Sequence, residues 1–330
     1  MRATLFVYFQ LALINIFPNE VDTLRLLFLG DIMQHKGELE AALIKGENRN
    51  DPRSYDYSGY FENLKARFAE VDMRIANMET TFAKPPYSGY PTFCSPQTLL
   101  TESKKGGIDL FLTANNHICD KGKKGLTATM NLYDSLKVLY TGIYRDSLDE
   151  VSKNPLVVEL KGFRIAFLNY TYGTNGIHVP APFIVKLIDT NSIKTDLMRA
   201  KATNSDFIIA CLHWGDEYIL KHNAYQERIE RFFYANGADI IIGSHPHVAQ
   251  DTNVEYGLNG EITHITVYSL GNAIANMTAS ITRKGMMAEI ILSKDGYGSK
   301  RILAPKFEYI WTSIPKQLNR NFTILPLLEK

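Results

Sequence analysis

Two histidines, His245 and His247, have the spacing in this sequence that most clearly suggests chemistry. Pro246 separates them and can continue neither a helix nor a strand ladder, so both side chains are expected on a stiff loop. The preceding run, 238–242, is β-branched, ends at Gly243 and predicts a buried parallel strand. Neutral imidazole is the commonest protein ligand for transition metals, and ligand sites of α/β folds lie at the carboxyl ends of strands. The pattern favours a metal site, and the alternative is a histidine pair in an ordinary turn.

Metal-competent side chains also follow four other predicted strands, 24–29, 71–79, 108–113 and 207–212. In chain order they are Asp31, Glu79, Asn116 (followed by His117) and His213. Each alone has an ordinary explanation as a turn, a helix cap or a core histidine. These separate explanations do not account for the placement of all of them at strand ends, because independent turns rarely supply oxygen and imidazole donors in this order. Mixed carboxylate, amide and imidazole donors suit Mn, Fe or Zn. Six donors exceed the need of one tetrahedral ion, so the sequence predicts two divalent transition metal ions that share a bridging carboxylate.

The elements that must position these donors alternate between strands and helices. Helical spacing predicts helices at 61–68, 122–137 and 224–236. Further strands are expected at 138–140, 163–169, 265–270, 286–292 and 307–314, the last two antiparallel. The stretch 84–96 contains four prolines and predicts a loop long enough to form a lid or substrate wall.

Composition excludes several classes of protein. The 330 residues carry 36 basic and 35 acidic side chains, and this net charge of +1 gives no reason to expect nucleic acid or an anionic surface as a partner. The hydrophobic content of 45% is enough for a sizeable core, and we see no repeat or long linker. The three cysteines, Cys94, Cys119 and Cys211, lack the spacing of a zinc site, and Cys211 is expected to pack inside a strand.

The run from Thr4 to Phe17 is almost entirely apolar and follows Arg2. It is too short to span a bilayer comfortably but fits the hydrophobic region of a secretory signal peptide. No clear cleavage site follows it, so an uncleaved anchor is an alternative, and an apolar first element of the fold is another. We expect 1–22 to be a signal peptide or N-terminal membrane anchor and 23–330 to form one domain. The protein is then expected to be exported to the periplasm or cell envelope.

The order of the motifs resembles that of the CapA family, which is named for bacterial poly-γ-glutamate capsule synthesis. The motifs are GD at 30–31, N-x-E at 77–79, ANNH-x-x-D-x-G at 114–122, H-W-G-x-E-Y at 213–218, G-x-H-P-H at 243–247 and Y-S-L-G-N at 268–272. The resemblance covers roughly 24–275. That family in turn resembles the calcineurin-like metallophosphoesterases. The expected fold is therefore α/β, a two-sheet β-sandwich flanked by helices in four αββα layers.

The resemblance also implies a role for each donor. The implied ligands are Asp31 and His247 for one ion, Asn116, His213 and His245 for the other, and Glu79 as the bridge. His117 takes the position of the general acid that protonates a leaving group. One departure matters, because Met33 stands where the related enzymes carry the histidine of a D-x-H motif, which leaves open one metal instead of two. A smaller departure is Ala273, where the family often has phenylalanine.

The expected function is metal-dependent chemistry, hydrolytic or transfer, in the synthesis, export or attachment of an extracellular polymer such as poly-γ-glutamate. One alternative is a metallophosphoesterase that acts on a phosphodiester or nucleotide. Another is a non-catalytic scaffold of a capsule export complex. The implied partners are an anionic polymer or phosphoester substrate and membrane proteins of capsule synthesis or export. Association with the membrane is expected to depend on the N-terminal segment.

Overall fold

The structure, a computed structural model, describes residues 21–315 and 321–327 of the chain. The predicted signal peptide or anchor at 1–22 lies outside the described residues, apart from its last two. Within the described ranges, no helix combines the length and the apolar character needed to cross a membrane.

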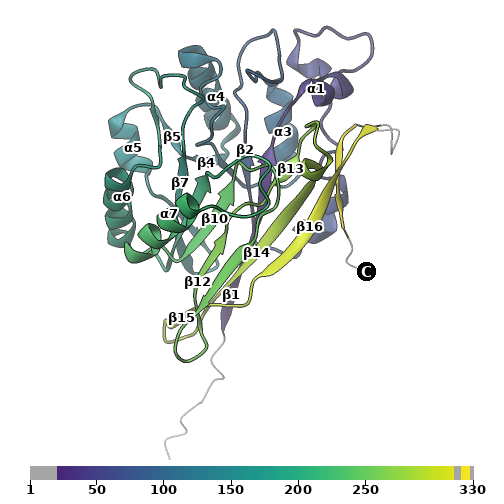
Figure 1. The fold of residues 1–330 in the computed structure, drawn as a ribbon. Coiled ribbons are helices and arrows are strands. Elements are labelled where there is room, and N and C mark those ends of the chain that lie inside the picture. The colour runs from purple at the N-terminus through teal and green to yellow at the C-terminus, as the bar shows by residue number, and fades with distance from the viewer. Residues whose placement is uncertain (1–20, 316–320, 328–330) are drawn as a thin grey trace, which may run out of the picture.

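One continuous β-sheet folds over so that its two halves face each other at the centre of the fold. Helices cover the outer face of each half (Figure 1). Hydrogen bonds link 15 strands of the described chain, with the main order β4-β3-β2-β1-β14-β15-β12-β10-β9-β7-β6. The first half holds β1 (Asp22–Ile32), β2 (Met73–Met78), β3 (Leu110–Leu112), β4 (Leu139–Thr141), β13 (Asn272–Ile274), β14 (Lys284–Lys294), β16 (Lys306–Ser313) and β17 (Thr323–Pro326). The second half holds β6 (Leu156–Leu160), β7 (Phe163–Thr171), β9 (Phe207–His213), β10 (Ile240–Ser244), β11 (Thr252–Tyr256) and β12 (Ile262–Val267). The short strand β15 (Lys300–Ile302) joins the halves, and β5 (Ile143–Tyr144) pairs separately with β8 (Ile184–Val185).

Alternating side chains of each strand divide between a central core and two outer cores. In β1, Leu26 and Phe28 lie in the central core, whereas Leu27 and Leu29 face the helices. The central core also contains side chains of β7, β9 and β10 from the opposite half. Because successive side chains of a strand point to opposite faces, this division makes each half a sheet that is buried on both sides. The expected four-layer αββα sandwich is confirmed.

The helices belong to the two outer layers. Those that pack on the first half include α3 (Gln97–Lys105) and α4 (Gly122–Leu136), and those that pack on the second half are α6 (Thr190–Ala202) and α7 (Ala224–Ala235). Shorter helices are α1 (Lys36–Ala42), α2 (Lys65–Phe68) and α5 (Ser147–Lys153), with 3-10 turns at Pro52–Ser54, Glu62–Leu64 and Ser280–Arg283.

Most elements expected from the sequence are present, with three differences. The predicted helices at 122–137 and 224–236 are α4 and α7, and the last two strands pair antiparallel as expected. The predicted helix at 61–68 is reduced to a 3-10 turn and the single turn of α2. Helices α1, α3, α5 and α6 and several strands, among them β6 and β11, were not predicted. Strand β1 runs on through Asp31 because β13 pairs with its end.

All three cysteines are buried and free, and Cys211 packs in the central core as expected.

Candidate metal centre

The predicted donors meet where parallel strands of the sandwich end. Asp31 is the second-last residue of β1, and Glu79 directly follows β2. His213 is the last residue of β9, and His245 directly follows β10. Parallel pairing keeps these ends level, since Asp31 is opposite Asn77 and His213 is opposite Ser244. Side chains that are far apart in the sequence are therefore presented at one edge of the molecule, as in other α/β folds.

Two glycines allow backbones to approach closely at this edge. A Cβ atom on Gly30 would lie 1.8 Å from the carbonyl oxygen of Gly271, and one on Gly243 would lie 1.9 Å from that of Tyr268. The backbone N–H of Asp31 donates to the Gly271 carbonyl at 3.0 Å. Since no side chain fits in either gap, the glycines of the GD and G-x-H-P-H motifs have a packing role.

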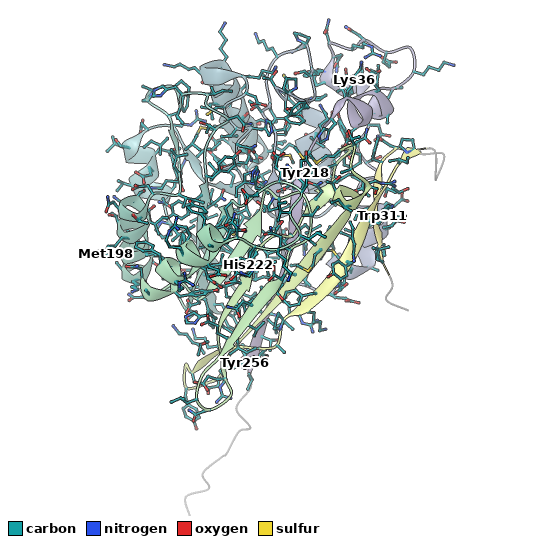
Figure 2. The ribbon with its side chains drawn as sticks, viewed as in Figure 1. Lys36, Met198, Tyr218, His222, Tyr256 and Trp311 are labelled. Atoms are coloured by element: carbon teal, nitrogen blue, oxygen red, sulfur yellow. The ribbon has the colours of Figure 1, made fainter. Side chains whose placement is uncertain are left out.

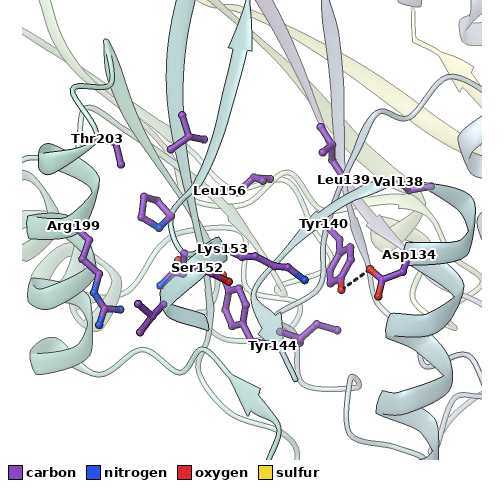
Figure 3. Close-up of a pocket in the computed structure, with 15 residues that line it drawn as sticks. Asp134, Val138, Leu139, Tyr140, Tyr144, Ser152, Lys153, Leu156, Arg199 and Thr203 are labelled. Atoms are coloured by element: carbon purple, nitrogen blue, oxygen red, sulfur yellow. Dashed lines mark hydrogen bonds between the residues drawn. The ribbon is translucent and has the colours of Figure 1, made fainter. Parts of the chain in front are cut away.

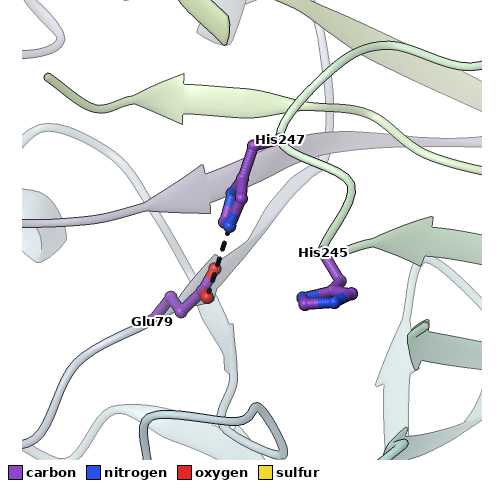
Figure 4. Close-up of side chains that lie close together, drawn as sticks. All are labelled: Glu79, His245 and His247. Atoms are coloured by element: carbon purple, nitrogen blue, oxygen red, sulfur yellow. Dashed lines mark ion pairs between the residues drawn. The ribbon is translucent and has the colours of Figure 1, made fainter. Parts of the chain in front are cut away.

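Five buried side chains converge there: Asp31, Glu79, His213, His245 and His247. Their potential ligand atoms form two sets, each within 4.8 Å: Glu79 with His245 and His247 (Figure 4), and Asp31 with Glu79 and His213. An oxygen of Asp31 also lies 3.3 Å from Nδ1 of His247. Glu79 Oε1 lies 3.5 Å from Nε2 of His213 and 3.9 Å from Nε2 of His247. The two sets share Glu79, so this carboxylate stands where a bridging ligand would stand.

The grouping differs in one respect from the ligand pairing implied by the family resemblance. His247 groups with His245, and Asp31 groups with His213, although the 3.3 Å contact between Asp31 and His247 ties the sets together. Asn116 borders the cluster, because its Oδ1 accepts a hydrogen bond at 2.9 Å from Nε2 of His213. The six predicted donors thus form one continuous group.

Unsatisfied polar atoms show that a cation fits this group. Both oxygens of Glu79 are buried and accept no hydrogen bond from the described residues, and Nδ1 of His245 is also without a partner there. A buried carboxylate without donors is costly, and a bound cation removes that cost. Carboxylate and imidazole donors together suit a divalent transition metal. The residues present therefore fit the metal centre that the sequence predicts.

The pKa values of the two carboxyl groups are shifted in opposite directions. Burial disfavours the charged form of Asp31, but hydrogen bonds with His247 and Asn77 and attraction to the positive charge of His247 outweigh it and lower the pKa to about 2. Burial, followed by repulsion from Asp31, raises the pKa of Glu79 to about 8.

The pKa values of the three candidate histidine ligands also differ. Burial lowers the pKa of His213 to about 3 and holds that of His245 well below its ordinary value, so both are neutral and available as ligands. Burial opposes the charged form of His247 as well. Attraction to Glu79 and a hydrogen bond with Asp31 outweigh it there and raise the pKa to about 9.

Polar side chains from the same motifs hold the donors in place. Nδ2 of Asn77 donates to Asp31 at 2.7 Å, and Ser244 bonds Nδ1 of His213 at 2.9 Å. Asn272 contacts Nδ1 of His247 at 3.0 Å, and Asn115 donates to the carbonyl of Met78 at 2.9 Å. The N-x-E and Y-S-L-G-N motifs therefore supply positioning groups beside the donors.

His117 lies next to the cluster and belongs to neither set of ligands. Its Nδ1 is 2.8 Å from Oδ2 of Asp120, and the edge of its ring meets Phe93 at a centroid distance of 4.5 Å. Asp120 also accepts the backbone N–H of Phe93 at 2.6 Å. Asp120 thus fixes the ring, a role that we did not assign from the sequence, although its i+3 spacing from His117 was visible in the ANNH-x-x-D motif.

A cavity of about 980 Å³ opens beside His117 and His247. Its wall includes Tyr90, Pro91 and Thr92 from the loop at 84–96, as the sequence predicts for a substrate wall. Other lining residues come from distant parts of the chain, among them Lys36, Asn175, Ile177, Glu217, Tyr218 and Met277. Figure 2 shows Lys36 and Tyr218 in the upper part of the molecule. Tyr172, from the segment after β7, packs its ring 4.5 Å from that of His245 and was not predicted.

Two residues just before α1 line the cavity without belonging to either set of candidate ligands. Met33, at the position of the missing histidine, is buried beside Phe93 and Ala275 and lines the cavity. His35 is the N-terminal cap of α1 and lies outside both sets of candidate ligands.

A second cavity, of about 650 Å³, lies at the side of the sandwich (Figure 3). Its lining includes Tyr140, whose hydroxyl bonds Asp134, together with Tyr144, Lys153 and Arg199. None of the described side chains of the two candidate metal sets lines it. The chemistry is therefore assigned to the cavity beside His117.

Known proteins share both the sequence and the fold. The family model described as bacterial capsule synthesis protein PGA_cap matches residues 25–277. The capsule biosynthesis protein CapA of Bacillus anthracis is 28% identical over 199 residues, 58% of this chain and 46% of that protein. The PGA biosynthesis protein CapA of Bacillus subtilis (strain 168) is 28% identical over 189 residues, 56% of this chain and 47% of that protein. The chain spans about half the length of these curated relatives.

Two solved structures share the fold at low sequence identity. A putative 5'-nucleotidase from Staphylococcus aureus, in complex with alpha-ketoglutarate, has a TM-score of 0.52 at 14% identity and covers 94% of this chain and 55% of its own. The NAD nucleotidase of Haemophilus influenzae has a TM-score of 0.53 at 12% identity and covers 94% of this chain and 54% of its own. At these identities the likeness shows the fold alone, which is of the metallophosphoesterase type. The family match covers every motif on which the resemblance rested, and the chain belongs to the bacterial capsule synthesis (PGA_cap) family.

Proposed function

We propose that this protein is a metal-dependent hydrolase or transferase that acts on an anionic extracellular polymer such as poly-γ-glutamate during capsule synthesis, export or attachment. The observation that carries the proposal is the unpartnered, buried Glu79 between two sets of metal-competent side chains, beside a cavity that His117 lines. Membership of the capsule synthesis family supports the polymer, and the metal-competent site supports chemistry over a purely structural role.

The proposed cofactor is one or two divalent ions of Mn, Fe or Zn, with Asp31, Glu79, Asn116, His213, His245 and His247 as ligands. When bound, such ions polarise an electrophilic carbonyl or phosphoryl group and supply an activated water. Glu79, shared by both sets, is the residue that would hold two ions together.

His117 is the proposed proton donor to the departing group. It faces the cavity, is not in either ligand set, and is held by Asp120 through Nδ1 at 2.8 Å. This contact leaves Nε2 as the ring nitrogen that can face substrate, and the Asp120 carboxylate stabilises the charged imidazole that donates. Tyr90 and Tyr218 also line the cavity, where their rings can contact a substrate.

Activity on defined substrates tests the proposal. The purified protein, loaded with Mn or Zn, is assayed on poly-γ-glutamate with an amine acceptor and on bis(p-nitrophenyl) phosphate. Shortening or transfer of the polymer, lost in His245→Ala and kept in His264→Ala, supports the proposal. His264 is a suitable control because it lies on β12 beside Glu255, outside the cavity.

The nucleotidase-like fold makes a phosphoesterase the second candidate. Turnover of bis(p-nitrophenyl) phosphate without any change in poly-γ-glutamate would favour the phosphoesterase. A protein that binds metal, turns over neither substrate and still restores capsule to a deletion strain in its His117→Ala form would be a scaffold, and the enzymatic proposal would be wrong.

The proposed location is the periplasm or cell envelope, because Thr4–Phe17 is an apolar run behind Arg2. Residues 1–25, fused to a reporter that is active only outside the cytoplasm, should switch the reporter on. A silent reporter at normal expression, beside an active control with a known secretory leader, would contradict export.

A further inference from the structure

We propose that the end of the sandwich opposite the metal centre is a membrane-facing surface, which inserts apolar side chains of two hairpin tips into the interfacial region of a bilayer. The tips are the β11–β12 turn, with Tyr256 and Leu258, and the β14–β15 turn, with Tyr297. We call this surface the hairpin end. The inference is independent of the reaction proposed above.

Strand pairing places both tips at one end of the molecule. Leu24 of β1 is opposite Leu292 of β14, which is opposite Ile302 of β15. Ile302 is in turn opposite Ile262 of β12. One row therefore crosses four strands, and both turns project beyond it. Figure 1 shows β15 beside the start of β1 at the lower end of the molecule, and Figure 2 places Tyr256 there.

The tips expose large apolar side chains almost completely. Leu258 is 105% exposed and Tyr297 is 84% exposed, the two highest values among the large hydrophobic side chains of the described residues. Tyr256 is 65% exposed. Isolated exposed apolar side chains are ordinary, whereas several that gather at one end of a molecule mark an interaction site. Tyrosine is also enriched where membranes meet water, because it has an apolar body and a polar tip.

The acidic side chains of the two turns bond the backbone of their own hairpins. Leu258 is flanked by the uncharged Gly257, Asn259 and Gly260, and Glu261 at the end of this turn accepts the backbone N–H of Asn259 at 3.1 Å. Asp295 is turned into its own hairpin, where it accepts backbone N–H groups of Tyr297 and Ser299 at 3.0 and 2.9 Å. The carboxylates of both turns are therefore hydrogen-bonded within their own hairpins.

Two lysines stand at the base of the β14–β15 hairpin. Lys294 and Lys300 both pair with Asp206, at 3.2 and 2.9 Å. Their long side chains can keep the ammonium groups at headgroup level while the tip above them is inserted.

The course of the chain favours a bilayer over a protein as the occupant. Strand β1 begins at Asp22, opposite Lys294, so the chain enters the fold at the hairpin end. The apolar run Thr4–Phe17 precedes it, and only residues 18–21 lie between. Four residues extend at most about 14 Å. A bilayer that holds the apolar run, even transiently during export, therefore lies within reach of both tips.

Environment-sensitive labels on the full chain test the inference. Leu258→Cys and Tyr297→Cys are labelled with a nitrobenzoxadiazole maleimide, since the three native cysteines are buried. Tyr90→Cys, at the cavity on the opposite end, and Leu148→Cys, on α5, are matched controls that are 75% and 80% exposed. Each protein is reconstituted into vesicles of phosphatidylcholine and phosphatidylglycerol.

We expect a blue shift of the emission and quenching by doxyl-labelled lipid at both tip positions and at neither control. Persistence of the shift at high salt would support insertion. A tip signal that high salt abolishes would reduce the contact to electrostatic attraction and overturn insertion. Equal signals at all four positions, or none at the tips, would also overturn the inference. Unchanged melting temperatures would show that the labelled variants are folded.

Discussion

At the scale of single residues, His117 and His245 separate proton transfer from metal binding. His117 contacts Asp120 and faces the cavity, whereas His245 belongs to a ligand set. His117→Ala should lower the turnover of the metal-loaded enzyme by about 10²–10⁴-fold, the usual contribution of a general acid, with metal content and melting temperature retained. His245→Ala should lose metal and stability together. Elemental analysis, thermal melting and rate measurement check both. Parallel loss of metal in the two variants would show that His117 is a ligand or a structural residue.

The raised pKa values of Glu79 and His247, about 8 and about 9, predict that protons compete with metal. The two groups are coupled, because the charge of Glu79 helps to raise the pKa of His247, so the pair holds one to two protons near neutral pH that a bound cation must displace. The logarithm of metal affinity should therefore rise with a slope between about one and two per pH unit below about pH 8, and flatten above about pH 9.

Calorimetry in buffers of different ionisation enthalpy measures this proton release. Glu79→Gln should release about one proton fewer, and His264→Ala should behave as the native protein. An affinity that is independent of pH between about 6 and 8 would contradict the assigned proton affinities.

At the scale of elements, the close approach of Gly30 to Gly271 predicts a strict requirement for glycine in β1. A Cβ atom at Gly30 would overlap the Gly271 carbonyl and force the end of β1, with Asp31, away from β13. Gly30→Ala should lower the free energy of unfolding by about 1–3 kcal/mol, the usual cost of overpacking, and weaken metal binding.

Gly59→Ala is the matched control, because a Cβ atom there meets nothing within 4 Å. Urea unfolding and metal titration check both variants. If Gly30→Ala proves as stable as Gly59→Ala and binds metal equally well, the packing role is wrong.

Strand ends were the most predictable elements, because a short apolar run bounded by glycine marks both the strand and its terminus. This pattern allowed us to predict β10 and the body of β1 with their donors, although β1 continues past Gly30 to Ile32 and so contains Asp31. Helix α6 was missed because buried Asp196 interrupts its apolar stripe. That carboxylate is satisfied by Lys186 at 2.8 Å and by the Tyr170 hydroxyl at 2.9 Å, partners that no local pattern reveals.

The edges of the site were less predictable than its centre. Tyr172 and Asn175 lie after β7 in a segment without periodicity, and only the folded chain brings Tyr172 against His245 and Asn175 to within 3.2 Å of Asn116. The family resemblance identified donors by their motifs, but it contained no information on side chains that reach the site from outside those motifs.

For the whole molecule, the proposed metal ligands come from strand ends in both halves of the sandwich, so metal binding should stabilise the fold. Metal at 100-fold above its Kd adds about 2.7 kcal/mol, which corresponds to roughly 5 °C in melting temperature for a domain of this size. Scanning calorimetry before and after treatment with a chelator measures the difference. His245→Ala should show no response to the chelator, and an unchanged midpoint in the native protein would remove the metal centre.

The length of strand β1 also sets the distance between the hairpin end and the metal centre. It runs from Asp22 at the hairpin end to Asp31 at the metal centre, and nine residue steps of about 3.3 Å make this distance about 30 Å. If the hairpin end rests on a bilayer, the reacting bond is held roughly 30 Å above the lipid surface. A bond within a lipid headgroup is then out of reach, and the substrate must be a chain that stands away from the membrane. The distance of the metal centre from the membrane would therefore favour bonds in the projecting part of a polymer over bonds near the lipid surface, before any side chain of the cavity contacts the polymer.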